Sequence, residues 1–115
     1  MKLRIHGNSV RLRLKQAEVA VIAGGGTVEG VCAIPGQRFT YRLTPGEDFT
    51  ACHSLGTLSV FVPQEALTRW ANSDQVGISG AAGAIDVLIE KDWNCIEASN
   101  PADNEDTFPH PAPSC

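Results

Sequence analysis

An internal repeat constrains this chain more than any other feature of its sequence. When the sequence is shifted on itself by about 48 positions, one pattern of apolar residues falls on another without gaps. The alternating apolar residues of 10–14 fall on those of 58–62, and two stripes with helical spacing coincide. These stripes are Val19, Ile22 and Ala23 in the first copy and Leu67, Trp70 and Ala71 in the second. The repeat predicts two similar structural units within one chain.

The rest of the alignment extends each unit to five elements. Gly24 falls on Asn72, and both residue types readily take the left-handed conformation that ends many helices. Further along, Val28 falls on Val76, and Phe39 and Tyr41 fall on Val87 and Ile89. We therefore expect a mainly β protein (β+α) with two ββαββ repeats, residues 1–43 and 49–91. The expected helices cover about residues 16–23 and 64–71, and the expected strands cover about residues 2–6, 10–14, 27–34, 38–43, 49–54, 57–62, 75–79 and 84–91.

The first hairpin carries most of the positive charge. Two runs that alternate polar and apolar residues flank the corner Gly7-Asn8-Ser9, which predicts a β-hairpin with two different faces. One face is apolar, and the other carries Lys2, Arg4, His6, Arg11, Arg13 and Lys15. Residues 1–48 hold seven basic and four acidic residues, a net charge of +3, whereas residues 49–115 hold two and nine, a net charge of −7. This split indicates a basic contact surface in the first half.

Residues 1–91 are expected to form one domain, and residues 92–115 an irregular tail. The tail contains Pro101, Pro109, Pro111 and Pro113 beside several acidic residues, a composition typical of irregular structure. Trp93 and Phe108 are the residues expected to hold it on the domain. One hypothesis is that the acidic tail folds onto Arg4, Arg11 and Arg13.

The order of elements resembles a known fold. A unit of strand, Gly-Asn-Ser turn, strand, short helix and two strands is similar to the AbrB-type swapped-hairpin proteins, including MazE-type antitoxins. In that family, two such units from separate chains interlace into a small barrel. The resemblance therefore implies an AbrB-like barrel as a single-chain pseudo-dimer over about residues 1–91. It also implies DNA binding through basic residues of the first hairpin, at Lys2, Arg4, Arg11, Arg13 and Lys15.

The whole chain also resembles a group of short, uncharacterised bacterial proteins. They open with Met-Lys-Leu-Arg-Ile-x-Gly-Asn-Ser and close with a Glu-Lys-Asp-aromatic-x-Cys segment and an acidic tail that contains Phe-Pro. Residues 1–14 and 90–95 and the pair Phe108-Pro109 match that pattern. The resemblance implies no activity.

Two functions follow as hypotheses. The first is a non-enzymatic bacterial binding or regulatory module with a protein partner, acting as a monomer or weak homodimer. The alternative is a DNA-binding regulator or antitoxin-like protein. Against DNA, the second copy has no positive charge at the matching positions, and the sequence pI of about 5.2 is low for a DNA-binding domain. The chain has no apolar run long enough for a membrane span and no signal peptide, which predicts a cytoplasmic protein.

Catalytic and metal sites find little support in the sequence. There is no nucleophile elbow, zincin helix or dinucleotide fingerprint, so we expect neither an enzyme nor a cofactor. Metal-ligating candidates are Cys95, His110 and Cys115, although the only pair with a spacing typical of zinc sites is His110-x₄-Cys115, which lies in the proline-rich tail. His53 aligns with an apolar position of the first hairpin and is expected to be buried and neutral. The four cysteines are expected to be free thiols, with a Cys95–Cys115 bridge as the alternative.

Overall fold

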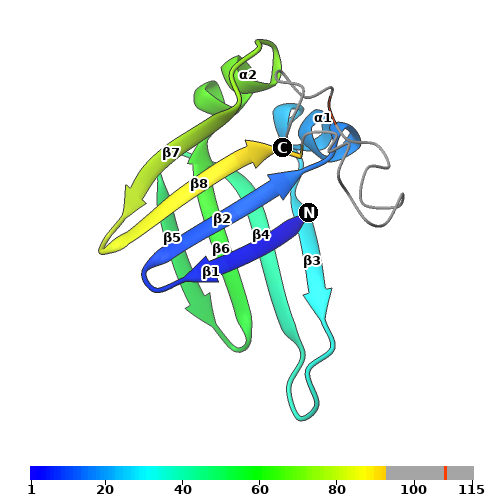
Figure 1. Ribbon diagram of the computed structural model, residues 1–115, viewed down its shortest axis with the longest axis vertical. Coiled ribbons are helices and arrows are strands. Elements are labelled where there is room, and N and C mark those ends of the chain that lie inside the picture. The colour runs from blue at the N-terminus through cyan, green and yellow to red at the C-terminus, as the bar shows by residue number, and fades with distance from the viewer. Residues whose placement is uncertain (93–107, 109–115) are drawn as a thin grey trace.

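The computed structural model describes residues 1–92 and Phe108. Two four-stranded sheets lie against each other, and two short helices lie together at one end of them (Figure 1). This mainly β architecture confirms the coarse fold class and all ten expected elements. The elements in chain order are β1 Lys2–His6, β2 Ser9–Leu14, α1 Gln16–Ala23, β3 Val28–Cys32, β4 Phe39–Gly46, β5 Thr50–Ser54, β6 Thr57–Pro63, α2 Gln64–Ala71, β7 Gly77–Ala82 and β8 Ile85–Lys91.

Each sheet takes one hairpin from each half of the chain. The first sheet has the order β1-β2-β8-β7, and the second has the order β3-β4-β6-β5. The halves meet in the middle of each sheet through parallel pairs, β2 with β8 and β4 with β6. Exchanging the two halves of the chain converts one strand order into the other. The two halves are therefore interlaced and not stacked side by side.

The core lies between the sheets and beneath the helices. Inward-facing residues of both sheets are fully buried, among them Leu12 and Ile89 of the first sheet and Leu43 and Val60 of the second. Alternation along the strands produces this segregation because successive side chains point to opposite faces. The helices add Ile22 and the largest buried side chain, Trp70. The two apolar helical stripes that the repeat predicted thus cover one end of the core. Phe108 packs against the same core.

The helices have the predicted limits, but they end differently. The residues after the last helical turn, Gly24 and Asn72, have φ values of −81° and −97°, so neither takes the left-handed conformation. In the first copy the left-handed residue is Gly25, at φ +92°. In the second copy the Asn72 side-chain amide donates to the Thr68 carbonyl at 3.0 Å and caps the helix instead.

The gapless alignment of the repeat is wrong in its last two strands. Val28 pairs with Leu43 in β3 and β4, and the corresponding buried pair in β7 and β8 is Ile78 with Ile89. Val76, which the alignment matched to Val28, is 42% exposed. The second copy thus has two additional residues before β7 and four fewer between the two paired positions. Strand β7 runs on to Ala82, so the turn before β8 is shorter than expected.

The barrel expectation is also wrong. Strands β1 and β7 each have one neighbour in the first sheet, and β3 and β5 each have one in the second, so neither sheet closes on the other. At the end away from the helices, inward-facing positions open to solvent: Ile5 is 55% exposed, and His53 is exposed as well. His53 is therefore not a buried histidine. Its ring lies beside Phe39, with the ring centroids 6.1 Å apart.

Neither α1 nor α2, the helices within the described part of the chain, is long and apolar enough to cross a membrane.

Candidate functional site

The outer face of the first hairpin gathers the predicted basic residues. Strand pairing places Lys2 opposite Arg13, Arg4 opposite Arg11, and His6 opposite Ser9. Because residues two apart on a strand share a face, all six side chains lie on the side of the sheet that points away from the core. We call this set the basic face.

The basic face opposes like charges. Directly opposed residues of an antiparallel pair have Cβ atoms about 4.5–5.5 Å apart, and like charges at such positions are destabilising. Both the Lys2–Arg13 pair and the Arg4–Arg11 pair are of this kind. The hairpin would therefore gain stability from carboxylates placed between these cations.

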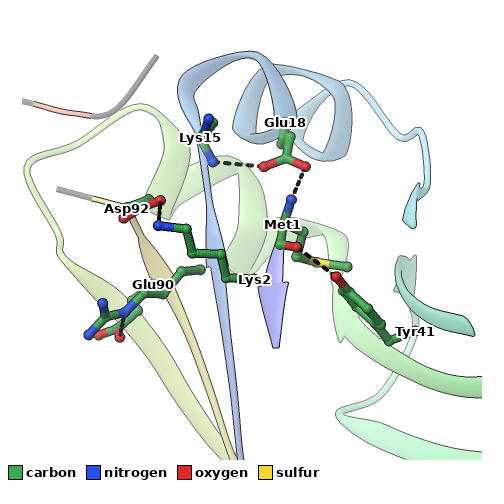
Figure 2. A network of polar contacts seen from close by, with 8 residues as sticks. Met1, Lys2, Lys15, Glu18, Tyr41, Glu90 and Asp92 are labelled. Atoms are coloured by element: carbon green, nitrogen blue, oxygen red, sulfur yellow. Dashed lines mark hydrogen bonds and ion pairs between the residues drawn. The ribbon is translucent and has the colours of Figure 1, made fainter. Parts of the chain in front are cut away.

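Strand β8 supplies those carboxylates on the β2 side. Glu90 pairs with Arg13 in the parallel register, and its Oε1 accepts a hydrogen bond from Arg13 Nε at 2.8 Å. The same oxygen lies 3.5 Å from Arg11 Nε. Lys2 Nζ lies 3.3 Å from Asp92 Oδ2, and Figure 2 shows both acids beside the hairpin. Among the described residues, Arg11 and Arg13 thus share Glu90 of the sheet, whereas the acidic residues beyond Asp92, which the tail hypothesis places on Arg4, Arg11 and Arg13, lie outside the described residues.

Asp92 is an unusual member of this set because it is buried. The residue is 4% exposed, and its Oδ2 has no hydrogen-bond donor within the described part of the chain. The 3.3 Å contact with Lys2 is an ion pair by distance but does not have hydrogen-bond geometry. Its backbone is held on both sides: the N–H donates to the Leu14 carbonyl, and the carbonyl accepts from the Phe108 N–H, each at 2.8 Å.

Arg4 has no acidic partner in the part of the chain that the structure describes. No carboxylate of residues 1–92 forms an ion pair with its guanidinium, whereas Lys2, Arg11 and Arg13 each have one. Arg4 lies on β1, the edge strand, and β2 separates it from the acids of β8. Among residues 1–92, three cations of the basic face therefore have an acidic partner, and Arg4 has none.

Two pockets lie on the basic face beside Arg4. One, of about 140 Å³, is lined by Arg4, His6, Ser9 and Arg11. The other, of about 320 Å³, is lined by Lys2, Leu3, Arg4, Arg11 and Arg13. Arg4 and Arg11 line both pockets. All the lining side chains except Leu3 can donate hydrogen bonds, so this surface can bind a negatively charged hydrogen-bond acceptor.

Lys15 lies apart from the basic face. It precedes α1 and lines neither pocket. Its backbone N–H donates to Glu18 Oε1 at 2.9 Å, and the other oxygen of that carboxylate pairs with the Met1 amino group (Figure 2). Tyr41 completes this network by donating its hydroxyl to the Met1 carbonyl at 3.0 Å. The structure thus unites four of the five predicted cations and leaves Lys15 at the helix start.

The corresponding face of the second sheet is neutral. The repeat predicts which residues of the second hairpin correspond to the basic residues of the first, and the register of β5 and β6 confirms the correspondence. The uncharged equivalents are Thr50, Cys52, Ser54, Ser59 and Phe61. The neighbouring Arg42 is fully paired, with Nε and Nη2 donating to Glu29 Oε2 at 3.0 and 2.9 Å. Of the four arginines in the described strands, Arg4 is therefore the one without an ion-paired carboxylate among residues 1–92.

The described residues offer no metal site. Within residues 1–92 and Phe108, no group of three or more His, Cys, Asp or Glu side chains is arranged to hold an ion. Cys52 and His53 point to opposite faces of β5, as their adjacency predicts, and both Cys32 and Cys52 are exposed free thiols. The predicted ligands Cys95, His110 and Cys115 lie outside the described residues, as do the predicted contact of Trp93 and the Cys95–Cys115 bridge.

Sequence reasoning missed a second buried charge beside Asp92, that of Lys91. This residue is 4% exposed; its Nζ donates to the Ser73 carbonyl at 2.6 Å and lies over the rings of Trp70 and Phe108. Burial lowers the pKa of Lys91, and the carboxylate of Asp74 partly opposes that effect. Its inward position follows from the alternation of β8, so the pattern Ile85, Val87, Ile89, Lys91 was the signal available in the sequence.

Comparison with known proteins identifies the family. A model of the protein family of unknown function DUF7009 matches residues 1–112. The chain belongs to this family. The match confirms the resemblance to an uncharacterised group and carries no information on source organism or on a relation to AbrB. Searches of curated proteins and of solved structures gave no match.

Proposed function

We propose that this DUF7009 protein is a non-enzymatic binding module that engages a protein partner through its basic face. The observation that carries the proposal is the mixed charge of that surface. Glu90 serves both Arg11 and Arg13, and Asp86 and Glu90 of β8 border the cations of β1 and β2, so the outer side of the first sheet carries both signs of charge. Mixed charge favours a partner with its own pattern of charges, because complementary charges select the partner and set its orientation.

We further propose an AbrB-like architecture, a single-chain pseudo-dimer of swapped hairpins. The support is topological: each sheet joins a hairpin of one half to a hairpin of the other through a central parallel pair. The two short helices, which begin 48 positions apart, occupy equivalent places. In this proposal the duplicated unit acts as a bacterial, cytoplasmic protein and as a monomer or weak homodimer.

DNA binding is the second candidate, and Arg4 favours it. An arginine opposed to another arginine and without a carboxylate partner is available for phosphate contacts. Two features count against it. The acids of β8 would repel an extended polyanion lying across the sheet, and the neutral second sheet offers no symmetric surface for the other half of a two-fold site.

A pair of photo-crosslinking positions tests the proposal. His6 and Ser54 are both exposed and hold the same position in the two hairpins, since His6 pairs with Ser9 and Ser54 with Thr57. A crosslinker that replaces His6 should join the chain to a discrete protein in its native cells, and Arg4→Glu should abolish the adduct. The same crosslinker at Ser54 is the control and should yield no such adduct.

Experiments with the purified protein distinguish protein binding from DNA binding. Retention of a short DNA duplex at physiological salt that Arg4→Glu abolishes would favour DNA, particularly with no protein adduct at His6. Equal adducts at both positions, or none at either, would refute binding through the basic face. Arg4 is preferred to Arg11 and Arg13 for charge reversal, because reversing those two would surround Glu90 with carboxylates and confuse unfolding with loss of binding.

A further inference from the structure

The smaller pocket of the basic face consists entirely of donors. Arg4 and His6 come from β1, and Ser9 and Arg11 come from β2 at the positions directly opposite them. Guanidinium groups have only donors, a serine hydroxyl can donate, and an imidazole carries at least one N–H. Four such side chains converge on a space of about 140 Å³, well above the roughly 10–15 Å³ that one water needs. The pocket therefore has room for a polyatomic anion.

The positive charge of the two opposed guanidinium groups favours the binding of an anion in this pocket. Arg4 faces Arg11 without an ion-paired carboxylate among residues 1–92, and Glu90, the acid that pairs with Arg11, is shared with Arg13. Glu90 Oε1 lies 2.8 Å from Arg13 Nε but 3.5 Å from Arg11 Nε, so it interacts more closely with the residue outside the pocket. Arg11 thus contributes positive charge to the pocket that Glu90 only partly offsets. An oxyanion between the two guanidinium groups would convert their repulsion into two attractions.

The surroundings limit the size of that anion. On β8, Asp86 is the neighbour of Ser9, and Glu90 is the neighbour of Arg13. These carboxylates border the pocket on one side without lining it. They would repel a second or third anionic group extending across the sheet. A single, compact, highly charged group suits this arrangement better than a polyanion.

We propose that Arg4, His6, Ser9 and Arg11 form a binding site for one phosphate monoester, carried by a phosphorylated side chain of the protein partner. Arginine forks hydrogen-bond to phosphate oxygens in a bidentate manner, and phosphorylated side chains are recognised by arginine clusters. The hydroxyl of Ser9 and the ring of His6 supply further donors for the remaining oxygens. This inference rests on the proposed function and specifies what the partner presents to the basic face.

The test uses inorganic phosphate first and a peptide second. Phosphate titrated at constant ionic strength should give saturable shifts in the ¹H–¹⁵N spectrum, confined to the β1–β2 hairpin, whereas chloride should not. A phosphoserine-containing pentapeptide should bind at the same place, and its unphosphorylated twin should not. Arg4→Gln should weaken phosphate binding by about tenfold or more, as expected for the loss of a hydrogen bond to a charged group.

Two further variants separate the site from general charge. Arg42→Gln also removes one strand arginine, from the neutral face, and should leave phosphate binding within about twofold. Arg11→Lys keeps the charge but loses the planar fork, so it should weaken binding as well. Unchanged spectra away from the hairpin establish that each variant is folded.

Three results would overturn the inference. The first is an absence of saturable phosphate shifts, and the second is equal weakening by Arg4→Gln and Arg42→Gln. The third is tighter binding of a DNA duplex than of the phosphopeptide, with a salt dependence that indicates several phosphate contacts. If the unphosphorylated peptide binds as well as its twin while the His6 adduct persists, the phosphate site fails and the proposed function stands. Phosphate binding without any adduct at His6, in a crosslinker variant that itself still gives the phosphate shifts, would show the reverse.

Discussion

Reversing the charge of Arg4 should stabilise the protein. Arg4 is exposed on an edge strand, has no acidic partner among residues 1–92, and lies directly opposite Arg11, whose side chain is 38% exposed. Arg4→Glu replaces a repulsive cross-strand pair by an attractive one. Most surface substitutions are neutral or destabilising, so a gain in stability is a distinctive outcome.

The size of the gain follows from simple electrostatics. Two unit charges about 6 Å apart in water interact by about 0.7 kcal/mol, so reversal of one sign changes the energy by about 1.4 kcal/mol before screening. A Debye length of about 8 Å at physiological salt reduces that figure by roughly half. The new carboxylate would lie two strands across and two residues along from Glu90, about 12 Å away, where repulsion is largely screened. We expect stabilisation of about 0.5–1 kcal/mol, or a rise in Tm of about 2–6 °C.

Thermal and urea unfolding at low and high salt measure this effect. The gain should fall below about 0.3 kcal/mol in 1 M NaCl, where the Debye length is about 3 Å. Arg4→Gln should give about half the gain. Arg4→Glu introduced into the Arg11→Gln variant should give almost no gain relative to that variant. Arg42→Glu is the matched control: it breaks the pair with Glu29 and should destabilise the protein. A loss of stability in Arg4→Glu at low salt, or a gain independent of salt, would refute the reasoning.

Two further predictions concern other parts of the fold. Lys91→Met should remove a rise in stability with pH: because burial lowers the Lys91 pKa, the unfolded chain holds this proton up to higher pH, and wild-type stability increases between the lowered pKa and the ordinary value of 10.5. Urea unfolding at several alkaline pH values should show that increase in the wild type and a smaller one in the variant. Leu55 precedes Gly56 in the β5–β6 turn, is 92% exposed, and has a φ of +51°, which is unfavourable for a leucine. Leu55→Asn creates the favoured Asn-Gly turn and should raise stability by about 0.5–1 kcal/mol in thermal unfolding. A lower Tm would contradict the idea that this leucine strains the turn.

The candidate site shows where prediction from sequence ended. Alternation along residues 2–6 and 10–14 identified the face that carries Arg4 and Arg11, and the Gly7 corner, at φ +56°, identified the turn between them. In the sequence alone, Glu90 is an ordinary polar residue of an alternating strand, and nothing near it indicates that it pairs with an arginine. Its role depends on the parallel pairing of β2 with β8, which joins residues 77 positions apart through Arg13 and Glu90. No local pattern encodes that pairing.

The repeat shows the same boundary in the fold. Both helices lie at the predicted residues because their stripes depend on neighbours three and four positions away. The gapless alignment failed at Val76 and Ile78 because loop lengths differ between the copies, and only the buried pair with Ile89 reveals which residue faces the core. Apolar alternation predicts faces, and it does not predict whether four-stranded sheets close into a barrel.

By itself, then, the sequence determined the number, type and order of the elements, the two faces of each strand and the location of the positive charge. These properties depend on turn chemistry and on side chains close together in the chain. Tertiary structure alone decided that hairpins of opposite halves share a sheet, that Glu90 and Asp92 pair with three cations of the basic face, and that no carboxylate among residues 1–92 pairs with Arg4. Those outcomes depend on contacts between distant segments, whose register is set by the packing of the whole core.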